Sequence, residues 1–182
     1  MHKPRKKAAS RKPLSQTLGG GDRRSIGASN QVAKQILRSH RRLTELIACL
    51  WSDDPLVSMR AADAAEKVSA SRPDLLERFK AELLGLAQEA AQPEIRWHMA
   101  LMLPRLHLSR AQTELARVTL RGYLDDQSSI VKTCALQGLS ELSRGDASGQ
   151  AETIELLEMA CRTGTPAMKA RSRKLLKGLR EA

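Results

Sequence analysis

The sequence predicts an all-α protein, on three observations. Aromatic residues make up only 2% of the chain, so a core has to be built mainly from Leu, Ala, Met, Ile and Val. The runs of β-branched and aromatic residues that mark strands are missing. Apolar residues recur instead at helical spacing, in segments that begin 36 to 38 residues apart. Together these features favour packed helices.

Residues 1–30 are the first element, and we expect them to form a disordered basic arm. Eight of them are Lys or Arg, and Asp22 is the one acidic residue. Large apolar side chains are scarce here, so burial cannot offset the entropy lost on ordering. A Gly- and Ser-rich stretch would connect the arm to a helical repeat domain over 31–182. A solubilising tail and a basic targeting segment are the alternatives. The candidate polyanion-binding residues of the arm are Lys6, Lys7, Arg11, Lys12, Arg23 and Arg24.

Four similar segments make up the repeat. Each begins with an apolar residue and ends with two apolar residues three positions apart, as expected for one face of a helix. Asp54-Pro55 and Thr165-Pro166 place an N-cap before a Pro at the first helical position, where a missing N–H has no consequence. The segments are VSMRAADAAEKV (57–68), IRWHMALMLPRL (95–106), VKTCALQGLSEL (131–142) and MKARSRKLLKGL (168–179).

A further helical segment precedes each of these four, after a short turn. Ser109 and Gln112 form a capping box before one of them. The preceding segments are 43–51, 74–90, 111–124 and 151–162. The body is therefore predicted to hold four helical hairpins, at about 35–70, 73–107, 109–143 and 149–180.

This pattern resembles the HEAT-repeat family over about residues 43–180. In that family the second helix of each pair opens with an Asp and carries a Val-Arg one turn later, and the Asp and Arg side chains form a ladder along the stack. Asp126 and Lys132 stand at the ladder positions, with Lys in place of Arg, and Arg96 keeps the basic half. The resemblance implies a right-handed α-α superhelix, a short HEAT-like solenoid with a concave face. Armadillo-like and other helical-pair solenoids are alternatives.

Trp97 is the residue that most indicates a binding surface. On a helical wheel it lies almost opposite Ile95 and Met99, which belong to the inward face. An aromatic side chain on the concave face would anchor a partner. Packing against the adjacent repeat is the alternative interpretation. The other candidate partner-binding residues are Arg60, Arg96, Leu101 and Lys132.

The last segment carries basic residues without an acid until Glu181. A charged outer face is expected of a terminal repeat, which has to stay soluble. Yet charge of one sign, added to the basic arm, also suits a phosphate-binding surface. The candidate polyanion-binding residues of this segment are Lys169, Arg173 and Lys177.

No pattern of residues indicates catalysis, a cofactor or a metal site. The three cysteines are scattered and form no Cys-x-x-Cys pair, which favours a reducing cytoplasmic compartment, and no segment suits a membrane span. The favoured hypothesis is a non-catalytic scaffold that binds a protein partner on its concave face. The alternative is phosphate-driven binding of DNA or RNA. A remote alternative is a HEAT-like DNA glycosylase, which requires aromatic residues and a carboxylate grouped on the concave face. The pattern joins no carboxylate to Trp97, with Glu94 and Glu141 the nearest.

Overall fold

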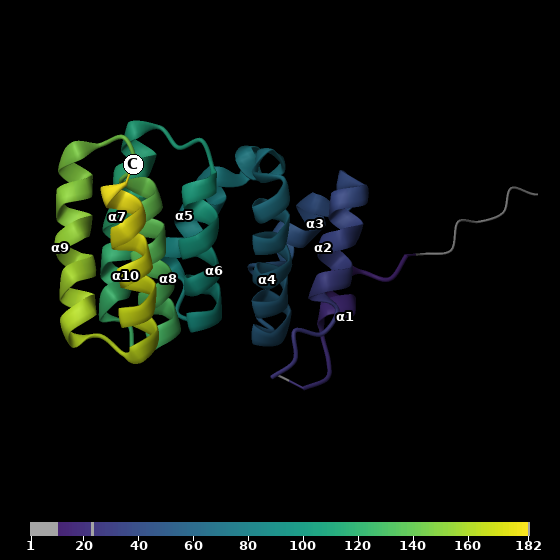
Figure 1. The fold of residues 1–182 in the computed structure, drawn as a ribbon. Helices are drawn as coiled ribbons and strands as arrows, with labels where there is room; N and C mark the ends of the chain where they lie inside the picture. The colour runs from purple at the N-terminus through teal and green to yellow at the C-terminus, as the bar shows by residue number, and fades with distance from the viewer. Residues whose placement is uncertain (1–10, 23, 182) are drawn as a thin grey trace, which may run out of the picture.

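The computed structural model describes residues 11–22 and 24–181, and within these ranges it holds helices and turns but no strand (Figure 1). The predicted all-α class is confirmed for this part of the chain. The α-helices are α1 (Leu14–Leu18), α2 (Ser29–Arg38), α3 (Leu43–Cys49), α4 (Pro55–Ser71), α5 (Lys80–Glu89), α6 (Pro93–Met102), α7 (Arg110–Gly122), α8 (Ser129–Leu142), α9 (Ala147–Thr163) and α10 (Pro166–Arg180). The 3₁₀ segments are η1 (His40–Arg42), η2 (Pro73–Phe79), η3 (Leu103–Arg105) and η4 (Tyr123–Asp125).

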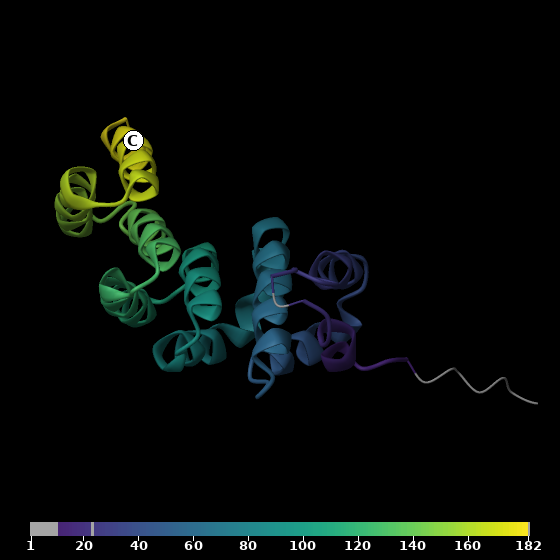
Figure 2. The same cartoon turned by 90° about the horizontal axis from the view of Figure 1, so that it is seen from below.

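Helices α4, α6, α8 and α10 form one row, in which each helix packs against the next. Each of them also packs against the helix that precedes it in the sequence, which is α3, α5, α7 or α9. Figure 2 shows α5, α7 and α9 as a second row beside the first, with α2 and α10 at opposite ends of the molecule. The segments predicted as helices therefore all lie on helical elements.

The predicted helix starts are confirmed. Pro55, Pro93 and Pro166 are the first residues of α4, α6 and α10. Asp54 and Thr165 cap two of these helices, because each side chain accepts a hydrogen bond from a backbone N–H in the first turn. These caps satisfy donors that a helix cannot satisfy internally.

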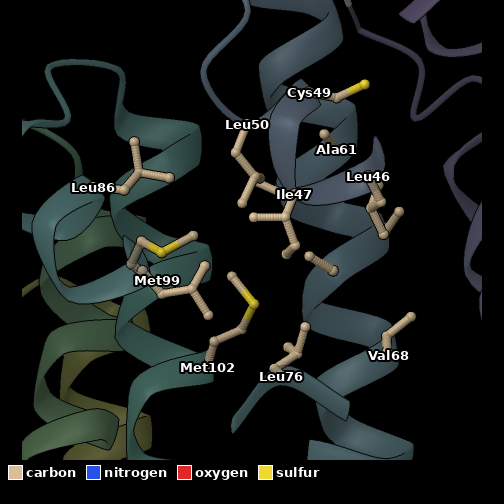
Figure 3. Close-up of a cluster of buried hydrophobic side chains, with 14 of the residues drawn as sticks. Leu46, Ile47, Cys49, Leu50, Ala61, Val68, Leu76, Leu86, Met99 and Met102 are labelled. Atoms are coloured by element: carbon tan, nitrogen blue, oxygen red, sulfur yellow. The ribbon is translucent and has the colours of Figure 1, made fainter. Parts of the chain in front are cut away.

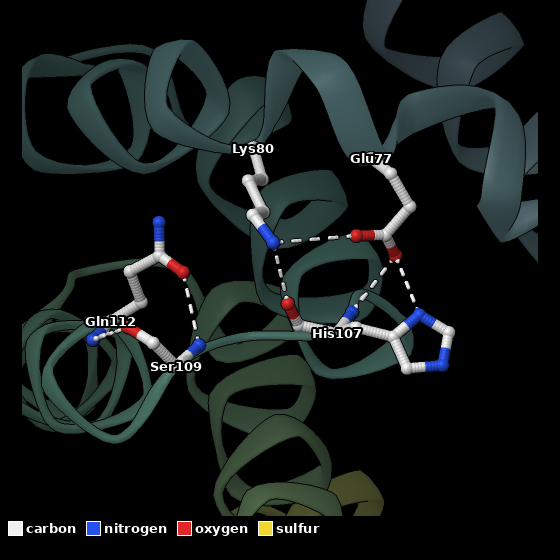
Figure 4. A network of polar contacts seen from close by, with 5 residues as sticks. All are labelled: Glu77, Lys80, His107, Ser109 and Gln112. Carbon is white, nitrogen blue, oxygen red and sulfur yellow. Dashed lines mark hydrogen bonds and ion pairs between the residues drawn. The ribbon is translucent and has the colours of Figure 1, made fainter.

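The turn before α7 is fixed by a polar network (Figure 4). Glu77 accepts hydrogen bonds from the backbone N–H of His107 at 2.8 Å, and its carboxylate lies 3.0 Å from His107 Nδ1. Lys80 donates to the His107 carbonyl oxygen at 2.8 Å. Ser109 and Gln112 form the predicted capping box, with both reciprocal hydrogen bonds present. The turn is therefore attached to Glu77 and Lys80, and the capping box fixes where α7 begins.

Four of the predicted helices are divided or shortened. The 43–51 helix ends at Cys49, and the 111–124 helix consists of α7 followed by η4. The 74–90 segment consists of η2 followed by α5, and nothing in the local residue types marks that division. Helix α6 ends at Met102 and gives way to η3, because Pro104 has no N–H to extend the hydrogen-bond ladder.

The core is built from aliphatic and methionine side chains. Met99 and Met102 of α6 are fully buried and face Ile47 of α3 and Leu50, the residue that follows α3 (Figure 3). Methionine has no branch at Cβ and several rotatable bonds, so it can fill irregular space between packed helices. This contact joins two successive helical pairs into one core.

The contact between α6 and α8 is close, and an ion pair crosses it. Gly138 of α8 faces the backbone of α6, where a Cβ would collide with the carbonyl oxygen of Ala100. Arg96 of α6 pairs with Asp126, in the turn before α8, at 2.5 Å. Burial raises the pKa of Asp126, but the hydrogen bond from the Ser128 N–H and the Arg96 guanidinium lower it more, so its pKa lies below the usual range. Asp126 is therefore ionised at neutral pH.

The structure corrects the predicted disordered arm for residues 11–22 and 24–30. Leu14 and Leu18, one turn apart on α1, are fully buried, and α1 packs against α3 and α4. Helix α2, which begins before the predicted domain boundary at residue 31, packs against α4. Composition misled here because two leucines that dock into an existing core gain about 1.5–3 kcal/mol each. Residues 1–10 lie outside the described ranges.

Arg60 of α4 holds the segment that follows α1. Its side chain is buried, with 3% of the residue exposed. The guanidinium donates hydrogen bonds to the carbonyl oxygens of Leu18 and Gly20 at 2.7 and 2.6 Å, Asp22 at 2.8 Å and Ser25 at 3.0 Å. A buried charge is tolerated when its donors are satisfied in this way.

The glycines of this segment allow the chain to wrap around Arg60. Gly20 and Gly21 have φ angles of 73° and 79°, in the left-handed region that glycine adopts without a Cβ penalty. At Gly27 a Cβ would lie 2.7 Å from the Arg60 guanidinium carbon. The stretch predicted as a linker is therefore a turn fitted to one side chain.

Replacing Arg60 with Ala should destabilise the protein by about 3 kcal/mol or more, because hydrogen bonds from a charged donor contribute roughly 1.5–3 kcal/mol each. Urea unfolding measures this loss. Trypsin cleavage after Arg24 should also accelerate as the segment detaches, whereas Arg60→Lys should restore little, since an ammonium cannot span four carbonyls. Wild-type stability with unchanged cleavage would show that Arg60 does not hold the segment.

Replacing Asp126 with Asn should cost about 1–3 kcal/mol at neutral pH, because the Arg96 guanidinium loses its charged partner. The stabilisation from a lowered carboxylate pKa exists above the unfolded pKa and is lost as the pH falls. The difference between wild type and variant should therefore shrink in acid unfolding experiments. Asp53→Asn, at an exposed position, is the matched control. Equal effects of the two substitutions would contradict the role of the ion pair.

Candidate partner-binding site

Trp97 lies in a hollow of about 670 Å³ between α4, α6 and the segment held by Arg60. We call it the Trp97 hollow. Its lining combines apolar side chains with carboxylates, which is the composition of a site that both buries and orients a ligand group. The lining residues are Asp22, Arg24, Ser25, Ile26, Met59, Arg60, Asp63, Glu94, Trp97 and His98.

The regular geometry of two neighbouring helices positions most of these side chains. Met59 and Asp63 are one turn apart on α4 and so share a face. On the facing side of α6, Glu94 precedes Trp97 by three residues and His98 by four, so it shares a face with each of them. The third wall comes from the Arg60-bound segment, so this wall depends on the hydrogen bonds of Arg60.

Trp97 is half-buried, and both interpretations of it from the sequence have a counterpart in the structure. Its ring packs against an apolar cluster that includes Ala100, Tyr123 and Val131. It also lines the hollow, beside the His98 ring at a centroid distance of 5.5 Å. The indole is thus held by one neighbouring pair of helices while part of it is open to a ligand.

His98 is a buried polar residue whose hydrogen-bonding capacity is not used. It is 8% exposed, and its Nδ1 has no hydrogen-bond partner among the described residues. Burial lowers the pKa of His98, against the opposing effect of the Asp63, Glu66 and Glu94 carboxylates. The imidazole is therefore neutral at pH 7, with one nitrogen able to accept and one able to donate.

The carboxylates of the hollow have different partners. Asp63 accepts hydrogen bonds from Ser29 of α2 and from Lys67, one turn further along α4. Asp22 accepts one from the backbone N–H of Arg24 at 2.9 Å. The sequence pattern joined no carboxylate to Trp97, and the structure corrects this by placing Asp63 and Glu94 in the same hollow.

Of the other partner-binding candidates, only Arg60 lines the same hollow. Its guanidinium is buried and already hydrogen-bonded to four carbonyl oxygens of this chain, so it is not available to a partner. This corrects its predicted role: it is a structural residue. Arg96 is engaged with Asp126 and with the Ala90 carbonyl oxygen at 2.7 Å. Leu101 is half-buried on α6. Lys132 lines a separate hollow of about 660 Å³ between α7, α8, α9 and α10.

The polyanion-binding candidates fall in three places. Lys6, Lys7 and Arg23 lie outside the described residues. Arg24 is exposed at the edge of the Trp97 hollow, and Arg11 and Lys12 line a different hollow beside α2. Lys169 is half-buried and Arg173 and Lys177 are exposed on α10, at the far end of the molecule (Figure 1).

Sequence reasoning missed Met59, Asp63 and His98 as lining residues. The repeat itself could have identified Met59. Met59 and Trp97 are each the third residue of their repeat segments, so the two consecutive helices place them on the same side of the row. Asp63 follows from Met59 by one helical turn. His98 carries no such signal, because its position is also typical of a core residue.

In comparisons with known proteins, no family model, no curated protein and no solved structure matches this chain. The described residues include no helix long and apolar enough to cross a membrane. The same residues contain no group of three or more His, Cys, Asp or Glu side chains arranged to hold a metal ion.

His98 should make stability fall as the pH is lowered. Its folded pKa is below the unfolded value of about 6.5, so the unfolded chain binds more protons as the pH drops from about 7 to 5.5. The loss is limited to about 1.4 kcal/mol per pH unit for one proton. His98→Gln should lose less stability than wild type over this range in urea unfolding. Equal losses would mean that His98 titrates normally.

Proposed function

We propose that this chain is a non-catalytic binding protein built as a short HEAT-like solenoid, a right-handed superhelix, and that it binds a segment of a partner protein in the Trp97 hollow. The row of α4, α6, α8 and α10 supports the solenoid, since each helix packs on the next. The Arg96–Asp126 ion pair supports the HEAT-like assignment, because it joins the ladder positions of consecutive second helices. The Trp97 hollow lies between two helices of that row, as expected for a concave binding face.

The observation that carries the proposal is a half-buried tryptophan flanked by further apolar side chains at the hollow's rim. Ile26 is 47% exposed, and Met59 and Trp97 are partly so. Aromatic and methionine side chains provide much of the affinity at protein interfaces, through well-packed pockets from which water is excluded. An extended or helical partner segment could place one apolar side chain against all three.

The charge of the hollow selects the partner segment. Asp63 is already paired with Lys67, whereas Glu94 makes no ion pair among the described residues, so a Lys or Arg of the partner can pair with Glu94. The whole chain has a net charge of +11, which repels basic ligands at long range. Screening limits that repulsion to about 8 Å at physiological salt, so groups within the hollow dominate after contact. We therefore expect a partner sequence with an apolar residue next to a basic one.

Selection from a phage-displayed library of random short peptides tests this. Peptides that pair an aliphatic or aromatic residue with Lys or Arg should be enriched. Their affinity should fall tenfold or more with Trp97→Ala or Met59→Ala, since hot-spot truncations cost about 2 kcal/mol. Trp51→Ala is the matched control, because Trp51 is 44% exposed on another surface and should leave the affinity unchanged. Enrichment of acidic peptides, or wild-type affinity in the Trp97 variant, would overturn the proposal.

The grouping of Trp97 with Asp63 and Glu94 also meets one requirement of the remote alternative, a HEAT-like DNA glycosylase. The Glu94 carboxylate, which has no ion-pair partner among the described residues, repels the phosphates of DNA, and this favours the peptide ligand. An excision assay on alkylated duplex DNA separates the two functions. No base release is expected, and release that Glu94→Gln abolishes would replace the binding function with a catalytic one.

A further inference from the structure

A third hollow, of about 960 Å³, lies between the start of α1, α2 and η1. We call it the basic groove. Among the described residues, its lining contains no carboxylate and no apolar side chain. The remaining lining residues carry hydroxyl or amide groups, which can also donate hydrogen bonds to an anion. The basic lining residues are Arg11, Lys12, Lys34, Arg38, Arg41 and Arg42.

A half-buried ion pair brings the two ends of this groove together. Arg42 donates to both carboxylate oxygens of Glu45, at 2.7 and 2.8 Å. Glu45 also accepts a hydrogen bond from the Leu14 N–H at 2.7 Å, and Arg42 donates to the Lys12 carbonyl oxygen at 2.9 Å. The Arg42–Glu45 pair thus clamps the chain just before α1. Arg11 and Lys12 are held beside α2 by this clamp and by the burial of Leu14.

The clamp neutralises Arg42 and leaves five cations without a carboxylate in the groove. Lys34 and Arg38 are one turn apart on α2, and Arg41 follows in η1; all three are exposed. Attraction to the C-terminal end of the α2 dipole accounts for Arg38 but not for Lys34 or Arg11. Five like charges around one hollow repel each other, and an anion with several negative groups relieves that repulsion.

Helix α10 is a weaker candidate for the same ligand. Its Arg180 pairs with Glu158 of α9 at 2.8 Å, and Lys177 lies 3.8 Å from Glu181. Part of its charge is therefore compensated. Its cations also lie along one exposed helix, without a second element to surround a ligand.

We propose that the basic groove binds the phosphate backbone of a nucleic acid, independently of the Trp97 hollow. Consecutive phosphates match a groove with five separate cations better than a single small anion does. No aromatic side chain lines the groove, so bases cannot stack there and binding is independent of sequence. A membrane surface is disfavoured, because stable attachment adds apolar side chains to the basic ones, and the lining has none.

The test is fluorescence anisotropy of the full chain with a labelled random-sequence DNA duplex and a labelled single-stranded RNA, across a salt series. Five phosphate contacts predict a slope of about −4.5 for log K against log salt on the duplex. Arg38→Ala/Arg41→Ala should reduce the magnitude of the slope by about 1.8 and weaken binding roughly tenfold at physiological salt. Arg173→Ala/Lys177→Ala on α10 is the matched control, with an expected change of less than about twofold.

An unchanged slope in the Arg38/Arg41 variant, or an equal loss in the α10 control, would overturn the assignment. So would a variant effect seen only with vesicles of anionic phospholipid and not with either nucleic acid. Stronger binding of one nucleic acid identifies DNA or RNA as the source of the phosphates. Thermal unfolding followed by circular dichroism should give wild-type stability for both variants, because neither touches the clamp. Trp97→Ala should bind nucleic acid like wild type, so the two proposals can fail separately.

Discussion

The buried guanidinium of Arg60 is the interaction on which the two candidate surfaces depend. Removing a charge from water costs several kcal/mol, and the cost is offset only when every donor finds an acceptor. Here the acceptors are backbone carbonyls of one segment, so the charge is satisfied only when that segment follows one particular path. Arg60 therefore specifies a conformation as well as stabilising it. The path creates a wall of the Trp97 hollow and starts α2 where it can pack on α4.

The row of α4, α6, α8 and α10 depends on close contact between neighbouring helices. Gly138 and Ala100 allow the backbones of α6 and α8 to approach, while Met99 and Met102 fill the wider space toward α3. Small residues at one contact and flexible ones at another let neighbouring helices pack without leaving voids. The Trp97 hollow opens on this framework, between α4 and α6.

Helical periodicity, capping residues and the repeat made most of the helices predictable, because each of these signals is local. Asp54 and Thr165 mark helix starts through contacts within three residues. The N-terminal segment was not predictable, because its order comes from Arg60, about forty residues away, acting on carbonyl groups that every residue type possesses. The candidate site was predicted in part. Trp97 was predictable as a site residue from its position on a helical wheel. Its neighbours Asp63 and His98 were not, because they meet Trp97 only through the way that α4 and α6 face each other.

The Trp97 hollow and the basic groove are both lined by one segment of the chain, which runs from the Arg42–Glu45 clamp to the start of α2. Arg11 and Lys12 at its start line the basic groove, and Ser25 and Ile26 near its end line the Trp97 hollow. A substitution that displaces this segment would therefore disturb both surfaces at once, whereas a ligand at one surface lies against no lining residue of the other.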